Sequence, residues 1–194
     1  MSLIQRLTSR GLQGIHEYRM RRLCRADGTT RFQRSGTVQN NSTDRGAVSI
    51  GKHSVVAGEL LVFGDGGRIE IGDYCFIGHG SRIWSSAQVA IGHRVLISHN
   101  VNIHDSISHS LSARERHEHF KGIFLHKQLH LPGVPKSAVT IEDDVWIGFN
   151  ASIMQGVHIG QGAIISAGAM VNKNVPAFTI VSGPAAMAIG PSFA

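Results

Sequence analysis

Residues 141–171 read IEDDVWIGFNASIMQGVHIGQGAIISAGAMV, and an apolar residue returns at every sixth position of this stretch. The returning residues are Ile141, Ile147, Ile153, Ile159, Ile165 and Val171. A six-residue period fits neither an α-helix nor a coiled-coil heptad. It fits a short strand followed by a tight corner, so that three strands and three corners complete one triangular coil of roughly 18 residues.

The same period is present upstream, where it is broken by insertions of three and two residues. The apolar series there consists of Ile50, Val56, Val62, Ile71, Ile77, Ile83, Ile91, Ile97 and Ile103. Glycine follows the apolar residue at positions 51, 72, 78, 92, 148 and 160. A small or β-branched residue often stands four positions after it: Ser54, Cys75, Ser81, Ala87, Val95, Ala151, Ala163 and Ala169. We expect the isoleucines to point inward, the small residues to fill corners, and the glycines to supply backbone angles that other residues avoid. The sequence therefore predicts an all-β solenoid over residues 47–194, whose coils bury their apolar rows against one another.

Charge is distributed unevenly along the 194 residues. The net charge is +6, and the first 45 residues hold nine arginines and three acidic residues, whereas the rest of the chain is balanced. A broadly basic nucleic-acid-binding domain would instead spread its charge over the folded face that meets phosphate. The two cysteines, Cys24 and Cys75, are too few for a disulfide framework. With no apolar leader or bilayer-length apolar segment in the sequence, we expect a cytoplasmic protein.

The first 46 residues are interpreted as a basic helix followed by a linker. Residues 2–24 place apolar side chains roughly along one helical stripe with arginines around it, and residues 25–46 are polar and rich in turn formers. Such a helix can cap the open end of a solenoid, which is the interpretation we favour. It can also lie on an anionic membrane through residues 1–25, which would give the protein a peripheral position at the inner membrane face.

Residues 109–138 interrupt the repeat. They read HSLSARERHEHFKGIFLHKQLHLPGVPKSA, a stretch of mixed charge and many histidines. Structureless loops of this length inside compact domains are uncommon and usually functional. We therefore expect one long extruded loop here, and expect the functional site to lie at its base.

The motif isoleucine-glycine-x-x-small-x resembles the signature of the left-handed β-helix acyltransferases with hexapeptide repeats. The stretches Asn100–Ser110 and Ile141–Gly148 resemble the sugar O-acetyltransferases of surface-polysaccharide pathways, and more distantly the maltose and galactoside acetyltransferases. The resemblance implies a left-handed parallel β-helix, acetyl-CoA as acyl donor, and a homotrimer. It further implies transfer of acetyl to a saccharide hydroxyl, on an acceptor that is free or lipid-linked.

Site residues follow from the same resemblance. His109 matches the family's general base, although it stands one position later relative to Asn100 than in the galactoside-type enzymes, which leaves His104 as a second candidate. A histidine poised near neutral pH can take the proton of a sugar hydroxyl as the oxygen attacks the thioester. Asp105, or a carbonyl, is a candidate to orient the imidazole. The positions matching the coenzyme A groove are Trp146, Ser166, Ala167, Gly168, Asn172 and Lys173.

Three alternatives remain open. An amino-sugar N-acetyltransferase on the same scaffold is the nearest. A zinc enzyme like the γ-class carbonic anhydrases would use His99, His104 and His109, which are spaced by five, but the coils offer no histidine where the third ligand should stand, so we expect no metal. The third alternative is a non-catalytic β-helix scaffold.

Overall fold

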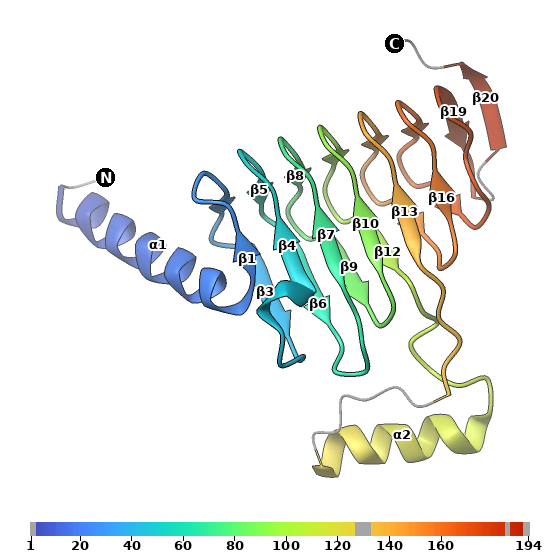
Figure 1. Ribbon diagram of the computed structural model, residues 1–194, viewed down its shortest axis with the longest axis horizontal. Coiled ribbons are helices and arrows are strands. Elements are labelled where there is room, and N and C mark those ends of the chain that lie inside the picture. Colours follow the sequence, from blue (N-terminus) through green and yellow to red (C-terminus); the bar gives the residue numbers. More distant parts are fainter. Residues whose placement is uncertain (1–2, 127–132, 185–186, 192–194) are drawn as a thin grey trace.

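The computed structural model describes residues 3–126, 133–184 and 187–191 and shows a parallel β-helix with two helices outside it (Figure 1). Three sheets, here called A, B and C, run along its axis, and successive coils contribute one strand to each. Sheet A contains β1 (Arg25–Ala26), β4 (Val48–Ile50), β7 (Ile69–Ile71), β10 (Val89–Ile91), β13 (Val139–Ile141) and β16 (His158–Ile159). Sheet B contains β2 (Arg31–Phe32), β5 (Val55–Val56), β8 (Phe76–Ile77), β11 (Leu96–Ile97), β14 (Trp146–Ile147), β17 (Ile164–Ile165), β19 (Thr179–Ser182) and β20 (Met187–Pro191), the last antiparallel to β19. Sheet C contains β3 (Thr37–Asn40), β6 (Glu59–Val62), β9 (Arg82–Ser85), β12 (Asn102–His104), β15 (Ser152–Ile153) and β18 (Met170–Val171).

The predicted apolar series forms the core. In sheet B, for example, Ile97 lies in register between Ile77 and Ile147, and all three side chains are fully buried. One position of the series is wrong: in β6 the residue in register with Ile83 is Leu60 rather than Val62. The corner after Val56 is shorter than the period predicts, so the strand is reached earlier.

The glycine that follows the isoleucine has a different role from the one predicted. These glycines do not adopt left-handed backbone angles; instead, they let one coil approach the next. A Cβ on Gly78 would lie 2.3 Å from the Ser98 carbonyl oxygen, and one on Gly148 would lie 2.5 Å from the Ala167 nitrogen. The left-handed angle occurs two residues later, where Asn100 has φ 56°. Its strain is offset by coil-to-coil bonding, because its N–H donates to the His79 carbonyl at 3.0 Å.

The interpretation of residues 25–46 as a linker is wrong, because these residues form the first coil. Strands β1, β2 and β3 pair in parallel with β4, β5 and β6. Phe32 is fully buried and Val38 is 3% exposed, so the coil has its own share of the core. The short 3-10 helix η1 (Arg45–Ala47) then leads into β4.

Helix α1 (Leu3–Leu23) agrees with the helix predicted over residues 2–24, of which residue 2 lies outside the described part. Its C-terminal half lies over the first coil at the open end of the β-helix (Figure 1). Gln13 Nε2 donates to the Phe32 carbonyl at 2.6 Å, and Arg21 Nη1 donates to the Asp27 carbonyl at 2.9 Å. These contacts are those of a cap. Neither α1 nor the other helix of the described residues has an apolar stretch long enough to span a bilayer.

The inserted residues leave the β-helix at one kind of corner, between a strand of sheet C and the next strand of sheet A. Residues 63–68 and 86–88 occupy this corner in two coils, and the predicted loop 109–138 leaves from the next one. Part of that loop is helical, since α2 spans Ala113–His126 and lies away from the coils in Figure 1. Residues 127–132 of the predicted loop lie outside the described residues. The interruption therefore follows four coils, one more than the periodicity alone suggests.

The two ends of the loop are fastened together. Ser106 and Lys136 form an antiparallel bridge, and the Ser137 N–H donates to the Asp105 carbonyl at 2.8 Å. Lys136 Nζ also donates to the carbonyls of Asp65 and Ser86, at 3.0 and 2.9 Å. The loop thus leaves and rejoins a closed corner, and the coils continue past it in register.

Candidate active site

A cavity of about 320 Å³ opens at the base of the loop, on the outer side of sheet C. It is lined by the end of β12, by the first loop residues and by the adjoining coil: Asn102, His104, Ser106, Ile107, Ser108, Ser152, Ile153 and Met154. Its rim therefore combines rigid strands with the start of an irregular segment. This arrangement fits the expectation that the site lies where the repeat is interrupted.

His104 is held rigidly at this cavity. It ends β12 in register with Trp84, and the two rings stack with centroids 4.9 Å apart at an interplanar angle of 16°. Trp84 is itself fixed, because its indole N–H donates to Glu59 Oε1 at 3.1 Å. Burial lowers the pKa of His104, an effect that Asp105 opposes and Arg82 reinforces. The ring Nε2 is buried and has no hydrogen-bond partner among the residues that the structure describes.

Asp105 has a structural task. It is fully buried, and its carboxylate accepts hydrogen bonds from the preceding coil: Ser85 Oγ at 2.6 Å, the Ser86 N–H at 2.8 Å and the Ala87 N–H at 2.9 Å. With both oxygens engaged in this way, Asp105 closes the corner from which the loop departs. The expected role of orienting an imidazole is not what these contacts serve.

His109 stands at the base of the loop, exposed, directly after the cavity-lining Ser108. Its ring lies 5.6 Å from the ring of His119 on α2. Both ring nitrogens of His119 are buried, and neither has a hydrogen-bond partner within the described parts of the chain. His119 was not among the site residues predicted from the sequence. The signal for its helix was Ser112 followed by Glu115, a capping-box pattern, and the Glu115 N–H does donate to Ser112 Oγ at 3.4 Å.

The candidate coenzyme A residues fall into two groups at opposite ends of the strands of sheet C. Trp146 on β14 is half-exposed, and its indole N–H donates to Ser98 Oγ at 3.4 Å. The corner Ser166–Gly168 follows β17, the strand paired with β14, so it lies one coil beyond Trp146. This first group stands where the strands of sheet C begin.

The second group stands where those strands end. Asn172 and Lys173 follow β18 and are exposed. They lie one coil beyond the cavity, since the N–H of the cavity-lining Met154 donates to the carbonyl of Val171. Within one chain the structure therefore brings Asn172 and Lys173 toward the cavity side and leaves Trp146 and Ser166–Gly168 on the other.

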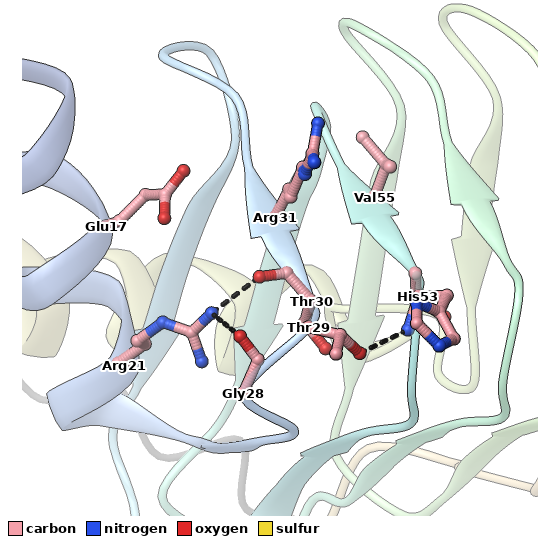
Figure 2. Close-up of a pocket in the computed structure, with 9 residues that line it drawn as sticks. Glu17, Arg21, Gly28, Thr29, Thr30, Arg31, His53 and Val55 are labelled. Atoms are coloured by element: carbon pink, nitrogen blue, oxygen red, sulfur yellow. Dashed lines mark hydrogen bonds between the residues drawn. The ribbon is translucent and has the colours of Figure 1, made fainter. Parts of the chain in front are cut away.

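A larger cavity of about 730 Å³ lies between α1 and the first coils, and Figure 2 shows its lining. Its most conspicuous cation, Arg21, points at the backbone: the guanidinium donates to the carbonyls of Gly28 and Thr30, at 3.3 and 2.5 Å. Because those donors are already used, Arg21 has few left for an anionic ligand. The cavity also lies at the far end of the β-helix from the loop, so we place the candidate site at the smaller cavity.

The histidines proposed for a zinc site do not gather. In register with His104 stands Trp84 rather than another histidine, and His99 lies on the corner before β12. Among the residues that the structure describes, no group of three or more histidine, cysteine, aspartate or glutamate side chains is placed to hold a metal ion.

Comparison with known proteins shows which family the repeat after the loop resembles. The family described as "Bacterial transferase hexapeptide (six repeats)" matches residues 138–173, the two coils that follow the loop. Those residues match the hexapeptide-repeat family, and the chain has the left-handed β-helix fold. The predicted fold class and the resemblance from which its handedness came are thus confirmed.

Relatives of this chain include a Staphylococcus aureus protein named 2,3,4,5-tetrahydropyridine-2,6-dicarboxylate N-acetyltransferase, 57% identical over 53 residues. That match covers 27% of this chain and 22% of the relative, so it spans about a fifth of the relative's length. A variant of AntD, an N-acyltransferase from Bacillus cereus solved with dTDP and coenzyme A, superposes with a TM-score of 0.69 at 15% identity, covering 91% of this chain and 90% of AntD. The polySia-specific acetyltransferase NeuO gives a TM-score of 0.65 at 24% identity, covering 87% of this chain and 71% of NeuO. At these identities the likeness of the structures shows the fold alone.

Proposed function

We propose that this chain is an acetyltransferase that moves the acetyl group of acetyl-CoA to a hydroxyl of a saccharide. The observation that carries the proposal is the pair of histidines at the interruption of the β-helix, with His104 lining the cavity and His109 one residue past its rim. The two coils beyond the interruption are those that match the transferase family. NeuO, named for acetylation of a sugar polymer, has the same fold over most of this chain.

His109 is the proposed general base. Its imidazole takes the proton of the acceptor hydroxyl while the oxygen attacks the thioester carbonyl, and the tetrahedral oxyanion is met by a backbone N–H at a coil corner. As the intermediate collapses, the carbon–sulfur bond breaks and the imidazolium returns its proton to the coenzyme A thiolate. No covalent enzyme intermediate is needed. His104 serves as part of the wall against which the acceptor is held, and Asp105 keeps that wall in place.

The two groups of candidate coenzyme A residues support an assembly of several chains. Because they stand at opposite ends of the strands of sheet C, a cofactor that touches both would lie between two copies. Trp146 and Ser166–Gly168 would come from one copy, and Asn172 with Lys173 from the other. The homotrimer implied by the resemblance meets this requirement. Light scattering of the purified protein at three times the chain mass would support it, and a monomer that turns over acetyl-CoA at full rate would refute it.

N-acetylation of an amino sugar is the second candidate. The named activities of the Staphylococcus aureus relative and of AntD favour it, since both transfer an acyl group to nitrogen. An amine that loses its proton near neutral pH needs less help from a base than a hydroxyl does. Loss of His109 should therefore harm O-acetylation more than N-acetylation, and matched sugars and amino sugars as acceptors separate the two.

Release of free thiol from acetyl-CoA, measured with a panel of sugars and amino sugars, tests the proposal. His109→Ala should lower kcat on a hydroxyl acceptor by about 100-fold or more. His104→Ala should chiefly raise KM for the acceptor, and His79→Ala, an exposed histidine on another corner, serves as the control. Unchanged turnover in His109→Ala would exclude that residue as base. Absence of turnover with the whole panel, together with stoichiometric zinc in the purified protein, would overturn the proposed reaction.

A further inference from the structure

The side of helix α1 that faces the protein is mostly polar, with Met20 as an apolar residue packed against the core, whereas several large apolar side chains of the helix face outward. The inward side carries Gln13 and His16, whose Nε2 lies 2.8 Å from the Gly36 carbonyl oxygen. The outward side carries Leu12, Ile15 and Tyr18, which are 60%, 53% and 63% exposed. An amphipathic helix that served only as a cap would have the opposite arrangement, with its apolar stripe on the core. The apolar side chains on the outward side thus do not pack against the β-helix, and a binding partner would account for them.

Arginines stand among these apolar residues. Arg19 and Arg22 are exposed and fall on the outward side of the helix, between and beside Ile15 and Tyr18 in its 3.6-residue period. The acidic residue of this helix, Glu17, is instead on the inward side, where it accepts from Gln13 at 3.1 Å. The whole positive excess of the chain lies in its first 45 residues. The outward side therefore combines apolar, aromatic and cationic groups with no carboxylate between them.

We propose that this outward side of α1, made of Leu12, Ile15, Tyr18, Arg19 and Arg22, binds an anionic lipid surface. Apolar side chains can enter the boundary between headgroups and acyl chains while long arginines reach back to lipid phosphates. Tyrosine favours the same boundary, since its ring is apolar and its hydroxyl is polar. The inward bonds of α1 to the first coil would keep the helix attached to the protein while its outer side lies on the membrane. The same face of a second copy would be a poorer occupant, because the like charges of two such faces would repel.

Sedimentation of the full-length protein with extruded vesicles tests the inference. At low salt the wild type should sediment with vesicles of phosphatidylcholine containing about a third phosphatidylglycerol, and stay in solution with phosphatidylcholine alone. Arg19→Gln with Arg22→Gln should lower the partition coefficient by about 30-fold, since each arginine near an anionic surface contributes roughly a factor of five. Leu12→Gln with Ile15→Gln should lower it as well, and raised salt should weaken wild-type binding.

Two controls make the outcome specific. Lys52→Gln with Lys121→Gln removes two positive charges elsewhere and should leave sedimentation as in the wild type. Light scattering of the Leu12→Gln, Ile15→Gln protein should give the wild-type oligomeric mass. The inference fails if the wild type does not sediment with anionic vesicles, if the arginine variant sediments as well as the wild type, or if the apolar variant changes the oligomeric mass. The acetyl-transfer assay with soluble acceptors is independent of each of these outcomes.

Discussion

Asp105 shows how a residue beside a candidate base can serve the fold rather than the chemistry. Its carboxylate is fully buried and satisfies the Ser86 and Ala87 N–H groups at the corner before β10. Asp105→Ala leaves those donors buried and unpaired, which should lower the free energy of unfolding by about 3 kcal/mol. Glu70→Ala, which removes a half-exposed carboxylate on β7, should change it by less than about 1 kcal/mol. Chemical denaturation compares the two variants, and equal losses would show that Asp105 does not fasten the corner.

His104 should make stability depend on pH. Burial holds its pKa below the usual value of 6.5, so the folded protein binds the proton less readily than the unfolded chain. The contribution of the neutral ring is thus present above about pH 6.5 and is lost as pH falls toward the lowered pKa. His104→Phe keeps the stack on Trp84 and removes the titration. The fall in Tm between pH 8 and pH 5.5 should be smaller in this variant, with His79→Gln as control; parallel curves would show that the burial of His104 has no such effect.

Among the elements, the coils built on isoleucine were predictable because an apolar residue returns at every sixth position. The first coil was not, although Ala26, Phe32 and Val38 keep the six-residue spacing. Alanine replaces isoleucine there and no glycine follows, so the local signal is weak. The first coil forms because its strands pair with β4, β5 and β6, and the six-residue unit of this coil alone does not show that pairing. Helix α2 was missed for another reason: its apolar residues, such as Phe120 and Phe124, remain exposed, so it lacks a stripe buried against the coils.

At the candidate site, the region could be predicted from the sequence, but the contacts between its residues could not. The break after Ser108 and the histidines around it were visible in the repeat itself. The stack of His104 on Trp84 joins residues 20 positions apart, and it depends on the register of β12 with β9. The ring contact of His109 with His119 depends on how α2 folds back. Such relationships belong to pairs of coils and cannot be read from one six-residue unit.

The loop can be removed without breaking the coils, because its ends already meet. Replacing residues 111–133 by a short glycine-serine linker keeps the Ser106–Lys136 bridge and the bond from Ser137 to Asp105. We expect a folded protein whose Tm lies within a few degrees of the wild type, since loop length changes stability only slowly. Acetyl transfer should be lost, because His119 and the rest of α2 are absent although His109 remains. Circular dichroism and thiol release measure the two effects, and retained transfer would assign the loop no part in the reaction.

On the scale of the whole molecule, each coil is stabilised by the coils on either side of it. The two terminal coils have a neighbour on one side only, so each end of the β-helix needs a cap. At the N-terminal end, the first coil and the inner side of α1 together cap the coil that begins with β4. A truncation that begins at residue 12 keeps Gln13, His16 and Arg21, and with them the bonds to the first coil. Removal of residues 1–46 instead exposes the edges of β4, β5 and β6 together with the apolar layer of Ile50, Val56 and Leu60.

The two truncations should therefore behave differently. The shorter one should give a soluble protein with a Tm close to that of the wild type, because the cap is intact. The longer one should aggregate, since an open parallel edge above an apolar layer recruits other chains. Dynamic light scattering and thermal unfolding at equal concentration distinguish the outcomes. If the protein lacking residues 1–46 were monodisperse and as stable as the wild type, residues 25–46 would be dispensable to the fold, as a linker would be. If it aggregates while the shorter truncation does not, residues between 12 and 46 belong to the folded unit, whose boundary then lies before residue 47.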